Sequence, residues 1–387
     1  MIEVRIHQRG ARGTYQAFAS LPGNHQFRQS LRTTDEETAK RKAREIEAQL
    51  NSGVRPDAAL TVEEWLRLWV TELRREGRQP NTLRSYERIA KQYIKPRIGR
   101  VRLVELTVAD VQRMDADLLE HGGRGGRALD PVTVKQAHDM LAAAIHEAER
   151  QSLVIRNVAS LARRPKQPHR TPRWLERDEA LRLFEAAPGH AWGAFVAVGA
   201  LTGLRAGELC GLRWEDVDFE RGELRVQRQR RYDGPDIGYV DAAPKSHAGV
   251  RVVPLCVEAR QWLEAVQAHQ AQAGVLLGKS PSLWVFSHRG RGATRGQWLP
   301  WTPQAAARGV GDLYRSVGLE VPKRPIHALR HTTGTLLADA SADPKVRAAL
   351  LGHADVKTTY WYTHASRASR QQAMAGVGSA LRKTGEN

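Results

Sequence analysis

Residues 326–364 read IHALRHTTGTLLADASADPKVRAALLGHADVKTTYWYTH. The stretch begins with three polar residues at the spacing i, i+3 and i+4, which a helix places on one face: His327, Arg330 and His331. Pro325 suits the first turn of such a helix. We therefore predict a helix that holds the polar triplet in place while its apolar residues face a core: Leu329, Leu336 and Leu337.

A second, shorter helix is predicted to follow, from Asp343-Pro344 to Gly352. Glycine readily adopts the left-handed conformation of a C-cap, so Gly352 suits the end of this helix. Its apolar residues are expected to point inward: Val346, Leu350 and Leu351. His353 comes directly after the cap, and Tyr362 follows nine residues later.

The ordered set H-x-L-R-H, L-G-H and T-T-x-x-Y-x-H resembles the C-terminal signature of the tyrosine recombinases, the phage integrase family. A single H-x-x-R would carry no weight, because a histidine near an arginine is usually a solvated or capping pair. The resemblance implies a site-specific integrase that cuts and rejoins DNA through a 3′-phosphotyrosyl intermediate and so integrates or excises a phage or mobile element. It implies Tyr362 as the nucleophile and no metal or other cofactor.

A second motif, TGLRAGEL at residues 202–209, belongs to the same resemblance. Gly203 lets the chain turn, and Arg205 starts a new helix. Glu208, three residues on, can accept a hydrogen bond from this arginine and fix its orientation. The resemblance implies that Arg205 and Arg330 are the two arginines that grip the scissile phosphate.

The catalytic lysine is expected near a β-hairpin. Glu223–Arg231 and Val250–Leu255 show the alternation of a β-hairpin, and Lys245 lies in the connecting segment PKSHAG. Similar chains carry their catalytic lysine on this hairpin. Because the connection is long, Lys323 stays open as an alternative.

These residue types suit transfer of a phosphodiester. Two arginine forks neutralise the charge of the phosphate without a metal. Tyrosine, whose unperturbed pKa is about 10, needs a base or a positive site to become a phenolate. His327 is the candidate base, His353 would hydrogen-bond the phosphate, and Lys245 would protonate the departing 5′ oxygen as general acid. A partner strand's 5′ hydroxyl reverses the step, so no ATP is required.

Length and charge indicate several domains and a polyanionic partner. A chain of 387 residues exceeds what one core usually organises. Its 60 Lys and Arg against 42 Asp and Glu give a net charge of +18, which favours DNA. We predict a mainly α multidomain protein with small β-sheets: an α+β domain at 1–57, a helical core-binding (SAM-like) bundle at 58–169 and a mixed α/β catalytic domain at 170–387.

The first two domains carry their own signals. Residues 1–57 contain three short β-type segments and a helix over 35–50, which resembles the arm-site-binding domain of phage integrases; a solubilising or oligomerisation module is the alternative. In the bundle, helices are predicted after the caps Thr61, Asn81 and Thr107, and a fourth from Pro131 to about Gln151. The candidate phosphate contacts of the bundle are Arg84, Lys91, Lys95, Arg124 and Arg127.

Other classes of protein fit less well. Cys210 and Cys256 lie far apart, which indicates neither a disulfide framework nor a zinc ribbon and fits a reducing cytosol. The longest apolar run, 191–204, is too short to span a membrane and predicts a buried helix. A metal-dependent nuclease using His327 and His331 is disfavoured, because Arg330 would repel a cation. A type IB topoisomerase and a non-catalytic DNA-binding regulator remain as alternatives.

The resemblance also implies partners and a location. Double-stranded DNA is expected at core sites and at arm sites, bound by a homotetramer. An excision factor or a host DNA-bending protein is an expected accessory. The expected location is the cytoplasm of a bacterial host, at the nucleoid.

Overall fold

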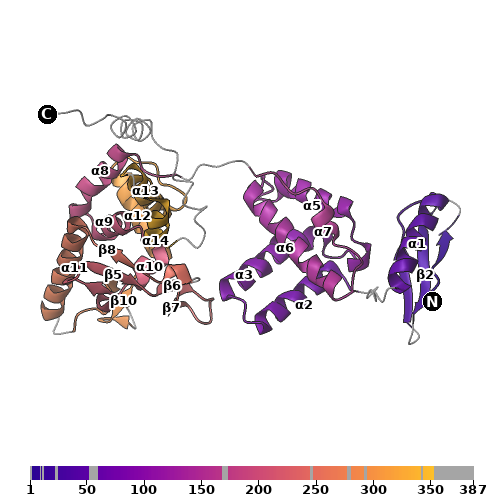
Figure 1. Cartoon of the computed structure of the whole chain (residues 1–387), viewed down its shortest axis with the longest axis horizontal. Coiled ribbons are helices and arrows are strands. Elements are labelled where there is room, and N and C mark those ends of the chain that lie inside the picture. Colours follow the sequence, from indigo (N-terminus) through magenta and orange to yellow (C-terminus); the bar gives the residue numbers. More distant parts are fainter. Residues whose placement is uncertain are drawn as a thin grey trace, which may run out of the picture. The chain divides into compact units, whose positions relative to one another are not determined.

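A computed structural model of the chain describes residues 2–352, except 9, 11–12, 22–24, 52–59, 168–172, 245–246, 277–279, 292–293 and 341–342 (Figure 1). The chain divides into two compact units, residues 1–170 and 171–387. Helices dominate both, and the strands form small antiparallel sheets, as the sequence predicts. In the part of the chain that is described, no helix has the length and hydropathy that crossing a membrane requires.

The first unit begins with the predicted small sheet and helix. The strands β1 (Arg5–Gln8), β2 (Tyr15–Leu21) and β3 (His25–Ser30) pair in sequence order, and α1 (Glu36–Asn51) packs on β1 and β2. Alternate residues of the strands meet one face of the helix in a small core of Ala17, Phe27, Leu31, Ala39 and Ile46.

The same unit continues into the helical bundle. Its longer helices are α2 (Val62–Arg75), α3 (Pro80–Ile89), α5 (Val108–His121) and α6 (Pro131–Arg150), with short α4 (Lys95–Ile98) and α7 (Val158–Leu161) between and after them. Thr61 and Thr107 close capping boxes with Glu64 and Asp110, as their positions predict. The predicted cap at Asn81 is wrong: α3 already starts at Pro80, because the fixed φ of proline suits the first helical position.

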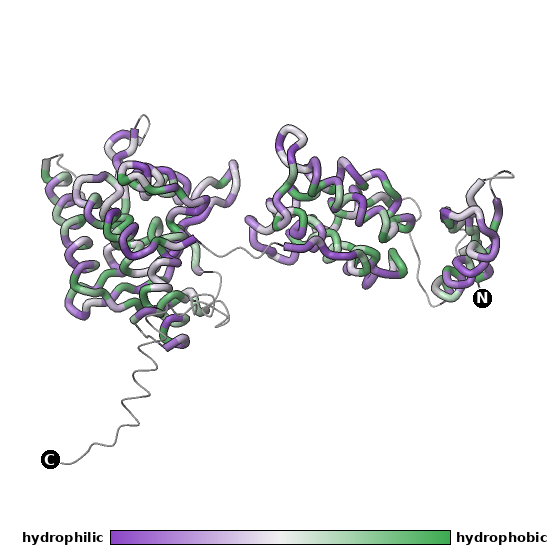
Figure 2. The backbone as a smooth tube through the Cα atoms, turned by 90° about the horizontal axis from the view of Figure 1, so that it is seen from above, coloured by the Kyte–Doolittle hydropathy of each residue, from purple (hydrophilic) through white to green (hydrophobic). Residues whose placement is uncertain are grey.

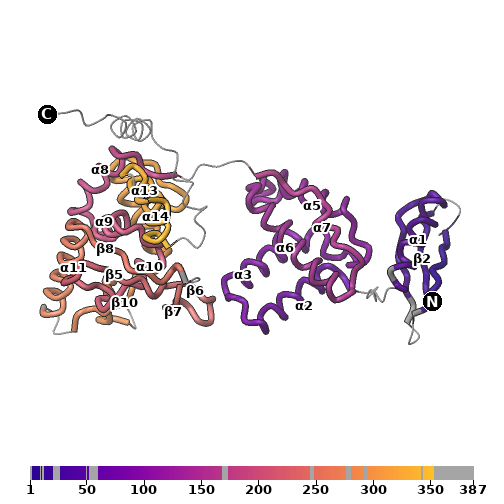
Figure 3. The backbone as a smooth tube through the Cα atoms, viewed as in Figure 1, coloured from indigo at the N-terminus to yellow at the C-terminus, as the bar shows by residue number. Residues whose placement is uncertain are grey.

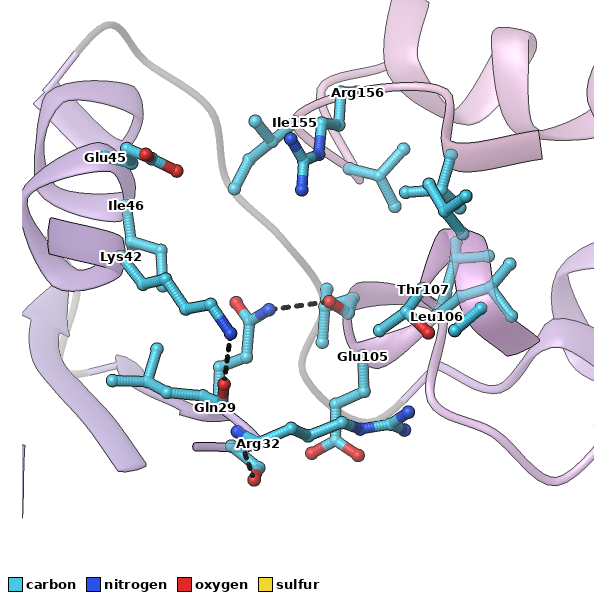
Figure 4. A pocket seen from close by; sticks show the side chains of 18 of the residues that line it. Gln29, Arg32, Lys42, Glu45, Ile46, Glu105, Leu106, Thr107, Ile155 and Arg156 are labelled. Atoms are coloured by element: carbon cyan, nitrogen blue, oxygen red, sulfur yellow. Dashed lines mark hydrogen bonds between the residues drawn. The ribbon is translucent and has the colours of Figure 1, made fainter. Parts of the chain in front are cut away.

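The end of β3 lies against the start of the bundle. The Gln29 side-chain amide donates to the Val104 carbonyl at 2.8 Å, and Arg32 Nη1 donates to Asp110 at 2.7 Å. Figure 4 shows the cavity of about 500 Å³ that these contacts border, with Lys42 bonded to the Leu31 carbonyl. Its lining is mixed, with both basic and acidic side chains beside apolar ones.

The second unit is built around α9 (Gly193–Thr202), the predicted buried helix. Every side of α9 is apolar, and it packs against α11 (Val257–Leu276) and α13 (Pro325–Asp339). The other helices are α8 (Arg177–Ala186), α10 (Ala206–Gly211), α12 (Pro303–Ser316) and α14 (Pro344–Leu351). In Figure 2 hydrophobic residues gather inside the helical parts of each unit, while hydrophilic residues follow the outer turns.

The strands of this unit correct one prediction. β5 (Glu223–Val226) pairs between β4 (Val217–Asp218) and β8 (Arg251–Pro254), as the hairpin requires. The predicted strand does not continue to residue 231, however. Gln227 and Arg228 both donate to the buried Asp216 and draw the chain away from the sheet. A separate hairpin follows, β6 (Gln229–Tyr232) with β7 (Tyr239–Ala242) (Figure 3), and β9 (Ser287–Arg289) pairs with β10 (Trp298–Pro300).

The helix α13 begins at the predicted Pro325, and α14 begins and ends as predicted, but the inward faces of both differ in part from the prediction. Leu329 is buried on α13, whereas Leu336 is 46% exposed. On α14, Val346 is 51% exposed, and Arg347, Ala348 and Leu351 are buried. The buried positions recur every three or four residues, so they mark the helix face that packs inward, and Val346 lies off that face.

Candidate active site

Arg205 is placed by a sharp turn after α9. Gly203 has a φ of +64°, and a Cβ there would stand 2.7 Å from the Leu351 side chain, so the turn requires glycine. Arg205 is the N-cap residue of α10, and its side chain and its backbone N–H both bind the Glu208 carboxylate. Its Nη1 donates to Glu208 Oε1 at 2.7 Å, and its backbone N–H donates to Glu208 Oε2 at 2.9 Å. The predicted contact between these two residues is therefore present.

Arg330 reaches the same turn from α13. Its side chain is 1% exposed, its Nη1 donates to the Gly203 carbonyl at 2.7 Å, and its Nη2 donates to the Leu351 carbonyl. Arg205 Nη2 donates to the next carbonyl along the chain, Gly352, at 2.7 Å. Tertiary packing thus brings together the two arginines that the sequence nominates.

The C-terminus of α14 is held by three arginines. The carbonyls of Leu350, Leu351 and Gly352 accept hydrogen bonds from Arg251, Arg330 and Arg205, respectively. The last carbonyls of a helix lack partners within it and form the negative end of its dipole, so guanidinium groups stabilise them. Gly352 is the left-handed C-cap, at φ +66°. The chain is therefore fixed up to the residue before His353.

Glu208 is the anion at the centre of this arrangement. It is 2% exposed and also accepts two hydrogen bonds from Arg251, at 3.2 Å from Nη1 and 2.9 Å from Nη2. Burial raises the pKa of Glu208, but the hydrogen bonds and charge of Arg251, together with the charge of Arg205, outweigh burial and leave this pKa below its ordinary value. Glu208 is therefore a carboxylate when it orients Arg205.

His327 and His331 lie on one face of α13, as predicted, with their ring centroids 4.5 Å apart. Burial, followed by the charges of His331 and Arg330, lowers the pKa of His327 to about 4. Burial and the charge of Arg330 lower the pKa of His331 to about 4. His327 is exposed and His331 is half-buried, so solvent weakens the effect of burial on both pKa values, most of all on that of His327. The charges of the neighbouring arginines lower the pKa of His327 in the same direction. Both imidazoles are neutral at pH 7 and can accept a proton.

Lys245, His353 and Tyr362 lie outside the described residues. The hairpin of β6 and β7 precedes Lys245 in the chain and β8 follows it. On the α10 side, Cβ atoms on Gly207 and Gly211 would stand 2.9 Å and 3.0 Å from the backbone of Arg230, so these glycines let β6 approach closely. On the other side, β8 carries Arg251.

The candidate DNA contacts of the bundle form two groups. Arg84, Lys91 and Lys95 follow one continuous helical stretch, from α3 through a π-helical turn at 90–94 into α4. Lys95 pairs with Glu63, and Arg84 bonds to Asn81. Arg124 and Arg127 are exposed in the loop between α5 and α6. Among the described residues, no cluster of three His, Cys, Asp or Glu side chains could hold a metal ion.

The sequence interpretation did not identify Arg251. The one signal it offers is a charged residue within the apolar strand pattern VRVVPL, which does not distinguish a buried arginine from a solvated one. No sequence signal indicates the hydrogen bonds from the arginines to backbone carbonyls, because every residue has a backbone carbonyl.

The lowered pKa values of His327 and His331 predict a pH dependence of stability. An unfolded imidazole has a pKa of about 6.5, so the unfolded state binds more protons below this pH. These histidines therefore contribute fully to the free energy of unfolding above about pH 6.5. Their contribution is lost as the pH falls toward about 4. NMR titration of the ring resonances should give midpoints below 6.5 for both, whereas ordinary or raised midpoints would contradict the assignment.

Comparison with protein families gives two matches. The model described as the phage integrase family matches residues 173–369. The model described as the phage integrase N-terminal SAM-like domain matches residues 61–118. The first match includes the described arginines of the site together with Lys245, His353 and Tyr362.

Curated relatives and solved structures agree with this result. A "Tyrosine recombinase XerC-like" protein of Caldanaerobacter subterraneus subsp. tengcongensis is 26% identical over 330 residues, which cover 79% of each chain. A "Tyrosine recombinase XerD" of Ralstonia nicotianae is 28% identical and covers 78% of this chain and 87% of its own. The Tn1549 transposon integrase bound to transposon right-end DNA shares the fold, with a TM-score of 0.67 and 23% identity over 82% of this chain and all of that one. A lambda integrase tetramer bound to a Holliday junction has a TM-score of 0.57 at 19% identity, over 92% of this chain and 94% of that one.

Proposed function

The chain belongs to the phage integrase family and is a tyrosine site-specific recombinase that cleaves and rejoins DNA, and we propose that Arg205, Lys245, His327, Arg330, His353 and Tyr362 carry the chemistry. The relatives and structures described above are recombinases and integrases, not topoisomerases or regulators. The observation that carries the proposal is the convergence of Arg205 and Arg330 on the carbonyls just before His353.

The arrangement suits a phosphate in the following way. Hydrogen bonds already fix the orientation of the Arg205 and Arg330 guanidinium groups, so these groups need little reorganisation when a phosphodiester binds. In the proposed reaction the Tyr362 oxygen forms a bond to phosphorus while the bond to the 5′ oxygen breaks. His327, neutral at pH 7, takes the tyrosine proton, and Lys245 gives a proton to the departing oxygen. His353 hydrogen-bonds the phosphate, and a 5′ hydroxyl of another strand reverses the sequence.

The remaining parts of the chain are proposed to hold and select DNA. The bundle would bind the core site through two groups of residues, Arg84, Lys91 and Lys95 on the helices and Arg124 and Arg127 in the loop. Residues 1–57 would bind arm sites. We propose assembly as a homotetramer on DNA in the nucleoid of a bacterial host, with an excision factor or DNA-bending protein as accessory.

The nucleophile can be separated from the nearby Tyr360. Tyr362→Phe should abolish the covalent protein–DNA adduct and retain DNA binding, because only the hydroxyl is lost. Tyr360→Phe is the matched control and should keep the adduct. The adduct is measured by denaturing gel electrophoresis in buffer with EDTA, on a core-site duplex defined by sequencing integration junctions. An adduct that persists in Tyr362→Phe and disappears in Tyr360→Phe would reverse the assignment.

The proton donor can be tested through the leaving group. Lys245→Ala should slow cleavage of an ordinary phosphodiester by about 10²- to 10⁴-fold, the usual contribution of a general acid. A sulfur at the 5′-bridging position leaves without a proton, so this substrate should recover most of the rate. Lys323→Ala is the control and should need no recovery. If the 5′-bridging sulfur restores the cleavage rate of the Lys323→Ala variant only, the general acid is Lys323.

The proposed role of residues 1–57 predicts a separation of activities. A fragment that starts at residue 58 should still form the Tyr362 adduct on a core site but lose efficient integration between two DNA molecules, because it cannot bridge two classes of site. DNA binding at arm sites by the intact protein should weaken with salt, by roughly 0.9 in log affinity per neutralised phosphate for each log unit of salt. Full recombination by the fragment would leave only a solubilising or assembly role.

A further inference from the structure

Arg251 is a buried arginine for which the proposed reaction has no role. We propose that it is a positioning residue: it neutralises Glu208, so that Glu208 can orient Arg205 without cancelling the positive charge that Arg205 offers to the phosphate. This inference rests on the proposed function of Arg205. It assigns Arg251 an effect on the phosphate that is transmitted through Glu208.

The contacts of Arg251 are directed inward. Its side chain is 6% exposed, and it donates to both oxygens of Glu208, with Nη2–Oε2 at 2.9 Å and Nη1–Oε1 at 3.2 Å. Its Nε donates to the Leu350 carbonyl at 2.7 Å, and Nη1 also donates to the Gly249 carbonyl at 3.1 Å. A two-pronged contact of this kind fixes the plane of the carboxylate as well as its position.

The two arginines that bind Glu208 differ in their exposure to solvent. The Arg205 side chain is 38% exposed, whereas the Arg251 side chain, on the other side of the same carboxylate, is almost closed to solvent. Gly352 lies directly against Arg251: a Cβ there would stand 2.8 Å from Arg251 Nη1. Arg251 is therefore covered by the end of α14, and the accessible arginine of the pair is Arg205.

The charges explain why a second arginine is needed. Glu208 with Arg205 alone would form a pair of zero net charge, and such a pair attracts a phosphate weakly. With Arg251 the group of three carries a net charge of +1. Since the carboxylate is buried, little water screens it, and its charge would otherwise act strongly on the adjacent guanidinium. Arg251 thus lets one carboxylate serve as an orienting acceptor while the site stays positive.

A substrate without the phosphate charge distinguishes this role from a purely structural one. Arg251→Met, which keeps much of the side-chain volume, should slow adduct formation on the core-site duplex by about 10- to 100-fold, as is usual for residues that orient a charged group of a site. On a duplex with a neutral methylphosphonate at the scissile position, the difference between wild type and variant should shrink severalfold, because the charge that Arg251 protects is no longer needed.

Three further variants complete the test. Arg251→Lys keeps the charge and should recover part of the rate on the ordinary substrate. Arg228→Met is the matched control, because Arg228 is 17% exposed and pairs with Asp216 and Glu215 instead of Glu208; its rate should equal that of wild type on both substrates. If Arg251→Met does not fold, as judged by circular dichroism and DNA binding, Arg251→Gln, which also lacks the charge, replaces it.

The outcomes separate the two proposals. A wild-type protein that forms no adduct would refute the proposed function itself. A wild-type protein that forms the adduct, together with an Arg251→Met or Arg251→Gln variant that is equally fast, would overturn the role of Arg251 alone. An equal slowing on charged and neutral substrates would also overturn it, since a loss of packing affects both alike.

Discussion

The guanidinium groups of three arginines in the second unit, two of them buried, donate to one carboxylate and to the end of one helix. Arg205, Arg251 and Arg330 come from the N-cap of α10, from β8 and from α13, and each donates to a carbonyl at the C-terminus of α14. Charges held away from water are costly unless they are hydrogen-bonded. Satisfying the arginines therefore also fixes the elements that carry them.

The same contacts that stabilise the fold also suit the proposed catalysis. Glu208 and the α14 carbonyls keep the guanidinium groups charged and oriented in the absence of DNA. A site whose donors are already oriented stabilises charge in the transition state without reorganising when the reaction occurs. The two glycines that flank the arrangement, Gly203 and Gly352, adopt left-handed conformations in which a side chain would be strained and would meet its neighbours.

The elements around the three arginines pack closely on one another. Gly207 and Gly211 let β6 pack directly on α10, and β8 enters from the other end of the connection that holds Lys245. The histidines of α13 are kept neutral by burial and by the nearby cations. In the proposed reaction, the positive charge that attracts a phosphate thus also keeps a proton acceptor neutral.

Much of this protein could be predicted from its sequence. Helix periodicity and the caps Thr61, Thr107 and Gly352 predict the main helices, and the ordered His, Arg and Tyr motifs indicate the family, because these signals depend on residues close together in the chain.

The tertiary structure decided the rest. Leu336 and Val346 are exposed because packing, not hydropathy, chooses the buried face of a short helix. The strand at 223–231 is divided because Asp216 draws Gln227 and Arg228 away from the sheet. Arg251 joins the site because folding brings its strand to Glu208 and to the end of α14, and contacts between residues so far apart leave no periodic trace in a single sequence.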